Sequence, residues 1–441
     1  MRVKQLVLAV AALAIAGGGI SFDAVAEDTH YIPNLSYRTG PFGGNGTRIA
    51  NGFNDYLTML NERDGGVGGL KVVVEECETG YNAQKGVECY EATKGKGALV
   101  YNPYSTGITL QLLPKSAVDK IPVLSMGYGL SAGAVGEKFP WLFNFPATYW
   151  GQMSGILRYI ATREGGDGST LEPLKGKKIG FIFLESGYGR EPIPLLDMLS
   201  KKYGFSVVTI PVAGKEMQNQ SSHWLTVRKE KPDWMIMWGW GVMNATAIKA
   251  AVKIRYPLDH FIGNWWSSAD VDAAPSGEAA KGYLGATFTG HGTDYPVIQD
   301  IIKHVIKAGK SQVKDESEVG TVLYNRGVIN AVYVAEAIGV AQKMTGKKKV
   351  DGTDMRAAFE NINMDEARLA ALGMTGFTIP IKSTCADHSG AHPIFMQQWD
   401  GSKWVRKGES SPMSDVVRPL LEAAAEKYVS DKPGWETQTC K

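Results

Sequence analysis

Short apolar stretches of strand-like length alternate with longer stretches of helical periodicity along most of this sequence. The predicted strands form two series, at 31–35, 72–74, 98–101 and 121–125, and at 179–184, 207–210, 235–238 and 261–263. Such alternation is typical of parallel sheets joined by crossover helices. Because the 441 residues exceed what one core usually organises, we predict an α/β fold of two doubly wound parallel-sheet lobes.

We expect the second half of the chain to add elements to both lobes and to cross between them. Helical patterns at 295–309 and 319–344 have no lobe of their own to complete, so we expect them to return to the first lobe. A strand candidate at 392–399 would then cross back to the second. Open α/β sheets bind ligands beyond the carboxyl ends of their strands, so this arrangement predicts a cleft between the lobes that closes around a solute by a hinge motion.

The first residues have the features of an export signal. Arg2 and Lys4 precede an apolar run at 6–16, and Ala24 and Ala26 form a small-x-small cleavage site. We therefore predict a signal peptide at 1–26 and a periplasmic location. The apolar run is too short and too interrupted by glycine for a membrane anchor, and the cleavage site has no cysteine for a lipid tether.

The cysteines and the charge balance indicate disulfides and give no sign of nucleic-acid binding. Cys77, Cys89, Cys385 and Cys440 are an even set, which in an exported chain favours disulfides. We predict that near neighbours pair, Cys77 with Cys89 and Cys385 with Cys440, although three connectivities are possible. The 47 Lys and Arg residues nearly balance the 45 Asp and Glu residues, so nothing predicts nucleic-acid binding.

No motif predicts a metal or a cofactor. His388 and His392 are four residues apart, but Gly390 between them and the following Pro393 make that segment a loop, so a metal site there is only weakly indicated. The glycine-rich stretch 40–47 lacks the Lys-Ser/Thr that a phosphate-binding loop requires, because Arg48 follows it.

Four motifs follow one another in a characteristic order: Thr39-Gly40-Pro41, the glycines of 65–69, Ile121 to Ser125, and Gly187-Tyr188-Gly189. From about 29 to 407 the chain resembles the periplasmic solute-binding proteins of ABC importers, in their branched-chain amino acid type. The resemblance implies a type I fold with three crossings, which we place near Thr148, Gly290 and Gly376. Lobe 1 would comprise 27–148 and 290–376, lobe 2 would comprise 149–289 and 377–408, and 409–441 would be a C-terminal extension.

The resemblance also implies a ligand site. In that family, hydroxyls and amides of two strand-end loops hold the ligand carboxylate, and the matching positions here are Tyr104, Ser105, Thr106, Gly127, Tyr128 and Gly129. Neutral hydroxyls and amides can bind a carboxylate through charge-assisted hydrogen bonds without a buried counter-charge. Alternatively, Ser105 and Thr106 only cap the following helix, although capping and anion binding are compatible.

Three further positions would shape the rest of the site. Tyr188 matches the family tyrosine that closes over the ligand, whereas Asn45 stands where the family has an aromatic residue and should widen or polarise one wall. Trp266 stands where amino-acid-binding members have an acidic residue. With Trp240 it offers an indole surface, so we rank aromatic carboxylates first as ligands and branched-chain or other apolar amino acids second.

These features predict a monomeric binding component that hands its ligand to an ABC permease and is not an enzyme. One alternative is a periplasmic sensor of the same fold. A second is a serine hydrolase, because Gly129 to Gly133 has the G-x-S-x-G pattern around Ser131. Ser131 lies six residues beyond the predicted strand end at Ser125, which does not fit a nucleophile elbow.

Overall fold

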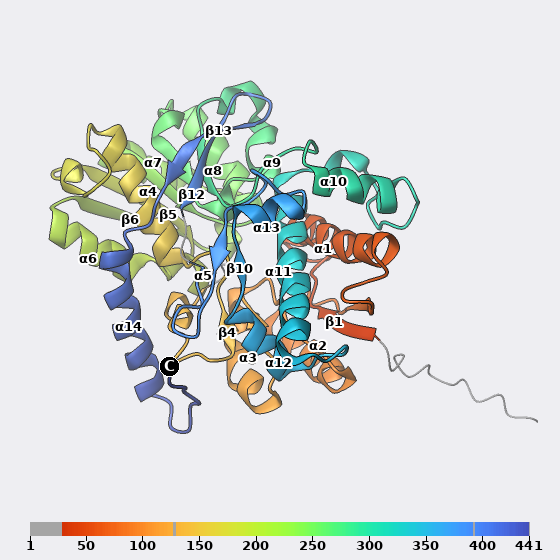
Figure 1. Cartoon of the computed structure of the whole chain (residues 1–441). Helices are drawn as coiled ribbons and strands as arrows, with labels where there is room; N and C mark the ends of the chain where they lie inside the picture. Colours follow the sequence, from red (N-terminus) through yellow and green to blue (C-terminus); the bar gives the residue numbers. More distant parts are fainter. Residues whose placement is uncertain (1–28, 127–128, 391–392, 441) are drawn as a thin grey trace, which may run out of the picture.

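The computed structural model describes residues 29–126, 129–390 and 393–440, so the predicted signal peptide lies outside it. Two groups of parallel strands, each flanked by helices, form the fold (Figure 1). In the first group, β1 (Thr29–Asn34) pairs with β2 (Lys71–Glu76), and β3 (Val123–Leu124) pairs with β4 (Leu142–Phe143). The predicted mixed α/β fold with mainly parallel strands is confirmed.

The strand predicted at 98–101 differs in the structure. Only isolated bridges, Tyr31 to Ala98, Asn34 to Asn102 and Tyr101 to Val123, connect this segment with its neighbours. These bridges are parallel and link β1 to β3. The segment therefore has the position of a central strand but lacks a continuous hydrogen-bond ladder.

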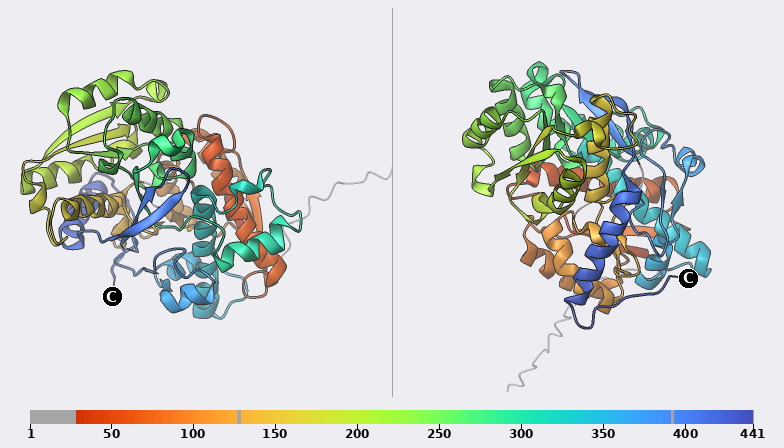
Figure 2. Two further views of the ribbon diagram at one scale, coloured as in Figure 1. Left: turned by 90° about the horizontal axis from the view of Figure 1, so that it is seen from above. Right: turned by 90° about the vertical axis from the view of Figure 1, so that its left-hand side faces the viewer.

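The helices of the first group come from both halves of the chain. They are α1 (Gly43–Arg63), α2 (Ala83–Thr93), α3 (Thr106–Asp119), α11 (Val322–Thr345) and α12 (Gly352–Phe359). α1 packs along α11, as Figure 2 shows from above. Glycines make this contact close: a Cβ atom on Gly52 would lie 2.0 Å from the carbonyl oxygen of Tyr324, and one on Gly327 would lie 2.0 Å from that of Ile49.

The second group is one seven-stranded sheet in the order β13-β12-β9-β8-β7-β5-β6. Its parallel strands are β5 (Lys178–Leu184), β6 (Ser206–Val212), β7 (Trp234–Trp238), β8 (Phe261–Gly263) and β9 (Leu284–Thr287). β12 (Ile394–Trp399) and β13 (Trp404–Ser410) add an antiparallel edge. The flanking helices are α4 (Tyr149–Arg163), α6 (Ile193–Tyr203), α7 (Ser221–Glu230) and α8 (Val242–Lys253).

The helix predicted at 295–309 is shorter and less regular than its pattern indicates. It consists of α10 (Pro296–Ile301) followed by a π-helical stretch, Ile302–Ile306. α13 (Glu366–Ala371) lies farther along the chain, beside the short antiparallel pair of β10 (Asn363–Met364) and β11 (Ile381–Lys382).

Residues 383–388 hydrogen-bond to elements of the first group. Ser383 N–H donates to Ile362 O at 2.9 Å, and His388 N–H donates to Ala134 O at 2.9 Å. The crossing near Gly376 and the lobe boundaries remain predictions, and these contacts favour a crossing that follows residue 388.

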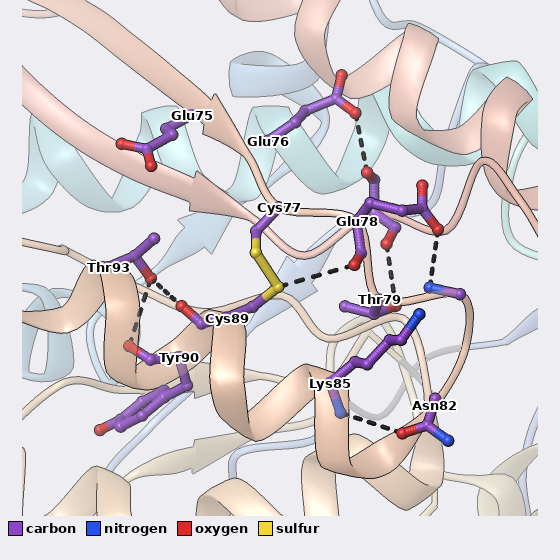
Figure 3. The surroundings of a disulfide bond; sticks show 12 residues. Glu75, Glu76, Cys77, Glu78, Thr79, Asn82, Lys85, Cys89, Tyr90 and Thr93 are labelled. Carbon is purple, nitrogen blue, oxygen red and sulfur yellow. Dashed lines mark hydrogen bonds between the residues drawn. A yellow bond between two sulfur atoms is a disulfide. The ribbon is translucent and has the colours of Figure 1, made fainter.

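Both predicted disulfide pairings are present. Cys77 and Cys89 join the end of β2 to α2 with a sequence separation of 12, and Figure 3 shows the hydrogen bonds around them. Cys385 and Cys440 close a separation of 55 residues. The second bond fastens the end of the chain to the segment that precedes β12.

The C-terminal extension connects the two groups of elements. α14 (Ser414–Ser430) follows β13 and runs down the side of the molecule toward the first group (Figure 1). Beyond it, Trp435 Nε1 donates to Lys138 O at 2.7 Å and Gln438 N–H donates to Glu137 O at 2.8 Å. We call residues 414–440 the C-terminal strap, because they start at the second sheet and end against residues 137–138.

An ion pair joins the second predicted crossing to the second group. His291 Nε2 lies 2.8 Å from Asp270 Oδ1 in α9 (Asp270–Ala273). Burial opposes charge on both groups, but their mutual hydrogen bond raises the pKa of His291 and lowers the pKa of Asp270.

The His291–Asp270 pair should make stability depend on pH. A raised histidine pKa stabilises the fold below the histidine's ordinary pKa, and that contribution is lost as the pH rises through the folded-state pKa. We expect His291→Gln to lower the free energy of unfolding by about 1 kcal/mol at pH 6. The difference should shrink toward zero at pH 9. Urea titrations at both pH values would measure it, and an equal difference at both would contradict the charged pair.

Candidate functional site

The first strand-end loop places its hydroxyls at the start of α3. Ser105 is the N-cap of that helix, and its Oγ accepts from Ile108 N–H at 3.4 Å. The Oγ1 of Thr106 accepts from Gly129 N–H at 3.1 Å, which brings the two predicted loops together. Tyr104 has a positive φ of 49° and is buried beside Phe53. Capping is therefore present, and the N-terminus of α3 lies beside the second loop, where its dipole would favour an anion.

The second loop is described only in part. Gly127 and Tyr128 lie outside the described residues, whereas Gly129 is described. A Cβ atom on Gly129 would lie 3.1 Å from Thr106 Cγ2 and 3.6 Å from Glu191 Cγ. Gly129 therefore lies beside both Thr106 of the first loop and the acidic side chain of Glu191.

Tyr188 belongs to α5 (Gly187–Arg190), directly after β5. Its hydroxyl donates to Gly239 O at 3.0 Å and is bonded to the side chain of Asn264. Burial raises the pKa of Tyr188 well above its usual value, so the hydroxyl stays protonated. The ring centroid lies 5.4 Å from that of Tyr149, the first residue of α4.

The two predicted tryptophans pack against each other and against the first group. The ring centroids of Trp240 and Trp266 are 5.2 Å apart. Trp240 also stacks on Phe42, which immediately precedes α1, at 6.5 Å. Gly241 permits this approach, since it has a positive φ of 64° and a Cβ there would lie 2.8 Å from Phe42 Cδ1. Both indoles are buried, and their aromatic neighbours come from both groups of elements.

The other two tryptophans of these strand ends are also buried. Trp238 in β7 packs edge-on against Tyr149, and Trp265 packs against Phe288 and Trp266. The guanidinium of Arg326, in α11, lies 5.0 Å from the ring of Trp265 and 5.2 Å from that of Trp266. Among the described contacts, this guanidinium is the basic group that lies nearest to the rings of Trp265 and Trp266.

Asn45 is less closely connected to the others. It lies in the first turn of α1 and is 9% exposed, and its Nδ2 has no hydrogen-bond partner among the described residues. Its main-chain N–H donates to Phe42 O at 3.0 Å, so Asn45 lies one turn from the ring that contacts Trp240. No described side-chain contact joins Asn45 to Ser105, Thr106 or Tyr188.

The structure adds two residues that sequence reasoning missed. Tyr149 contacts both Tyr188 and Trp238, and Glu191 reaches the second loop. Tyr149 directly follows the predicted crossing at Thr148, and Glu191 lies three residues after Tyr188, almost one helical turn. Proximity to those positions was the only signal in the sequence for either residue.

Ser131 is not arranged as a hydrolase nucleophile. Its main-chain N–H donates to Glu191 Oε1 at 2.8 Å, and its Oγ accepts from Trp150 N–H at 3.2 Å. Within the described ranges no histidine hydrogen-bonds to Ser131 Oγ, which a catalytic triad would need. The loop geometry therefore gives no support to the hydrolase alternative.

The described part of the chain includes neither a metal-binding cluster nor a membrane-spanning helix. No group of three or more His, Cys, Asp or Glu residues could hold a metal ion there. His388 is buried with its Nδ1 2.8 Å from Leu142 O, and His392 lies outside the described residues. None of the described helices is long and apolar enough to cross a membrane.

A sequence profile described as periplasmic binding protein matches residues 29–406. The chain belongs to this periplasmic binding protein family. The expected type I fold is confirmed by this match and by solved structures. Comparison with curated proteins finds no match.

Among solved structures, a protein from the Pseudomonas fluorescens group described as an ABC transporter permease is 37% identical to this periplasmic binding protein. That match has a TM-score of 0.87 and covers 94% of this chain and 100% of the other. A branched-chain amino acid ABC transporter protein from Thermus thermophilus with bound valine is 20% identical, with a TM-score of 0.72 and coverages of 88% and 98%. A solute-binding protein from R. palustris in complex with benzoate is 17% identical, with a TM-score of 0.66 and coverages of 87% and 97%. These last two show the shared fold.

Proposed function

We propose that this periplasmic binding protein captures a small organic carboxylate with an apolar or aromatic body. The observation that carries the proposal is the contact of α3, at whose N-terminus Ser105 and Thr106 lie, with α5, which holds Tyr188. Tyr188 is hydrogen-bonded next to Trp240, which packs on Trp266. Hydroxyls and a helix N-terminus suit a carboxylate, whereas rings suit an apolar body. The valine and benzoate bound by two structural relatives are ligands of this kind.

The proposed mechanism is capture by closure. In the open form the ligand carboxylate binds at Ser105, Thr106 and the 127–129 loop. Closure then brings Tyr188 and the indole rings of Trp240 and Trp266 over the apolar part of the ligand. In the structure, Phe42 contacts Trp240 and Ser131 contacts Glu191, which are contacts that closure would form. The closed shape would then be recognised by an ABC permease.

The proposal includes the biological setting that the resemblance implies. Cleavage of residues 1–26 would release a monomer into the periplasm, and the chain would bind its ligand without converting it. The two predicted lobes would move about the crossings, and the contacts of residues 383–388 with the first group favour a last crossing after residue 388. The absence of a histidine bonded to Ser131 within the described ranges favours binding over catalysis.

A thermal-shift panel tests the proposal. The panel contains benzoate, 4-hydroxybenzoate, cinnamate, L-leucine, L-valine and L-phenylalanine, and we expect at least one of them to raise the melting temperature. A ligand at about 100 times its Kd adds ~2.7 kcal/mol to the free energy of unfolding. The matched amides benzamide and L-leucinamide lack the carboxylate and should give no shift. Equal shifts from acids and amides, or no shift from any acid, would contradict a carboxylate site.

A further inference from the structure

A small cavity lies at the edge of the second group, at the predicted crossing near Gly290. It has a volume of about 90 Å³ and is lined by residues of β9, β12, β13 and the segment 289–295. The described residues of this lining include two basic side chains, His291 and Arg406, and no acidic one. Pockets for small organic ligands are usually several times larger, whereas a water molecule occupies about 30 Å³. The cavity therefore has the size for a small ion or a few water molecules.

Arg406 brings a cation without a counter-charge to this cavity. Its guanidinium lies 3.2 Å from the ring centroid of Phe395 and forms neither an ion pair nor a hydrogen bond with a described side chain. Partial burial lowers the pKa of Arg406, because the guanidinium loses hydration there. The carboxylates of Glu409 and Asp294 are exposed and lie outside the lining, so water screens their effect. The charge of Arg406 is thus available to a group from outside the chain.

The second basic side chain is already neutralised. His291 pairs through Nε2 with Asp270, which lies outside the lining. This pair raises the pKa of His291, and in the protonated imidazole Nδ1 is a second N–H donor. Lys403, whose charge opposes that of His291, is exposed and also lies outside the lining. Because the His291–Asp270 pair has no net charge, the guanidinium of Arg406 leaves the cavity with a single positive charge.

Two buried polar groups of the lining residues lack hydrogen-bond partners. Trp404 Nε1 and Thr289 Oγ1 have no partner among the described residues, and the two residues are 5% and 1% exposed. An indole N–H can only donate, so it requires an acceptor, and a buried donor without one is costly. Gly290 leaves room for a further hydroxyl, because a Cβ atom there would lie 2.0 Å from Tyr295 Oη. The lining residues therefore offer N–H and O–H donors together with a cation.

We propose that this cavity binds a monovalent anion of about the size of chloride, held by Arg406, Trp404 and Thr289. A water molecule could accept from the same donors, but it would not neutralise the guanidinium, whereas an anion forms charge-assisted hydrogen bonds with it. The bound anion would connect β13 to the segment that follows β9, and so fasten the predicted crossing to the antiparallel edge of the sheet. This inference is independent of the proposed function, because neither Ser105 nor Thr106 lines the cavity.

Chlorine nuclear magnetic resonance tests the proposal, because a chloride ion that exchanges with a protein site broadens the chloride line. Wild type should broaden the line, and added bromide should reverse the broadening by competition. Arg406→Gln should weaken chloride binding ~10-fold or more, and Trp404→Phe, which keeps an aromatic ring, should weaken it ~3- to 10-fold. Lys407→Gln removes the same charge from the next residue, which lies outside the lining, and is the control that should leave the affinity unchanged.

Bromide locates the site in the wild-type protein and needs no variant. Crystals soaked in sodium bromide should show an anomalous-scattering peak between Arg406 and Trp404. No peak there, or a peak at Ser105 and Thr106 in its place, would overturn the anion site. Line broadening that Arg406→Gln leaves unchanged would mark an adventitious ion only and would overturn it as well. Failure of every carboxylate in the thermal-shift panel would contradict the proposed function and leave this inference standing.

Discussion

Gly327→Ala is expected to destabilise the protein by about 3 kcal/mol or more, because α1 and α11 approach too closely to admit a methyl group. The new Cβ would lie 2.0 Å from Ile49 O and 2.8 Å from Phe53 N. Both are backbone atoms of α1, so neither can rotate away as a flexible side chain would. To admit the methyl group, α1 and α11 would have to move apart along the face on which they bury each other. Denaturant unfolding followed by circular dichroism would measure the loss.

Gly339→Ala is the matched control on the same helix. A Cβ at Gly339 has nothing within 4 Å, so the substitution should raise stability by ~1 kcal/mol through helix propensity alone. A decrease in the free energy of unfolding for Gly327→Ala, together with an increase for Gly339→Ala, would establish that Gly327 is required for packing. If Gly327→Ala also stabilised the protein, the close α1–α11 contact would be wrong.

Removing the disulfide between Cys385 and Cys440 is the second change with a large expected effect. Loop-closure entropy for a separation of 55 residues predicts a loss of about 4 kcal/mol, against about 3 kcal/mol for the separation of 12 between Cys77 and Cys89. We therefore expect Cys385→Ser with Cys440→Ser to lower the melting temperature more than Cys77→Ser with Cys89→Ser does. Differential scanning calorimetry of both double variants would measure this.

The location of the Cys385–Cys440 bond adds a second readout. It ends the C-terminal strap, whose Trp435 packs between Phe139 and Tyr428. Without the bond, protease cleavage should begin in residues 431–440, because exposed chain ends without a covalent tie open first. Cleavage that starts elsewhere, or an unchanged melting temperature, would show that the strap is held by its other contacts alone.

Much of the fold could be predicted because its signals are local. Strand periodicity located β5, β7 and β8 nearly to the residue, and helical spacing located α4 and α8. The pairings Cys77–Cys89 and Cys385–Cys440 agreed with the nearest-neighbour expectation. The strand predicted at 98–101 is less regular than expected. Its apolar pattern indicates burial but does not specify how many hydrogen bonds it forms with the neighbouring strands.

The candidate site was predicted only in part. The order of motifs indicated Ser105 and Thr106, which follow the segment 98–101 of the first group, and Tyr188, which follows β5 of the second group. Each position therefore lies beyond the carboxyl ends of parallel strands. Glu191 was missed because its importance arises from a partner 60 residues away, Ser131. Trp266 suggested a site without acidic groups, whereas in the structure the acidic side chain of Glu191 lies beside Gly129.

The sequence by itself determined the fold class and the family, and it favoured the disulfide partners and the strand-end positions of the proposed site residues. Each of these depends on spacing between neighbours in the chain, where periodicity and turn chemistry act. Only the tertiary structure decided which distant residues meet: Phe42 with Trp240 and Ser131 with Glu191 between the two groups, and Gly327 with Ile49 between α11 and α1. Such pairs depend on how separately folded elements pack together, and local patterns carry no information about that distance.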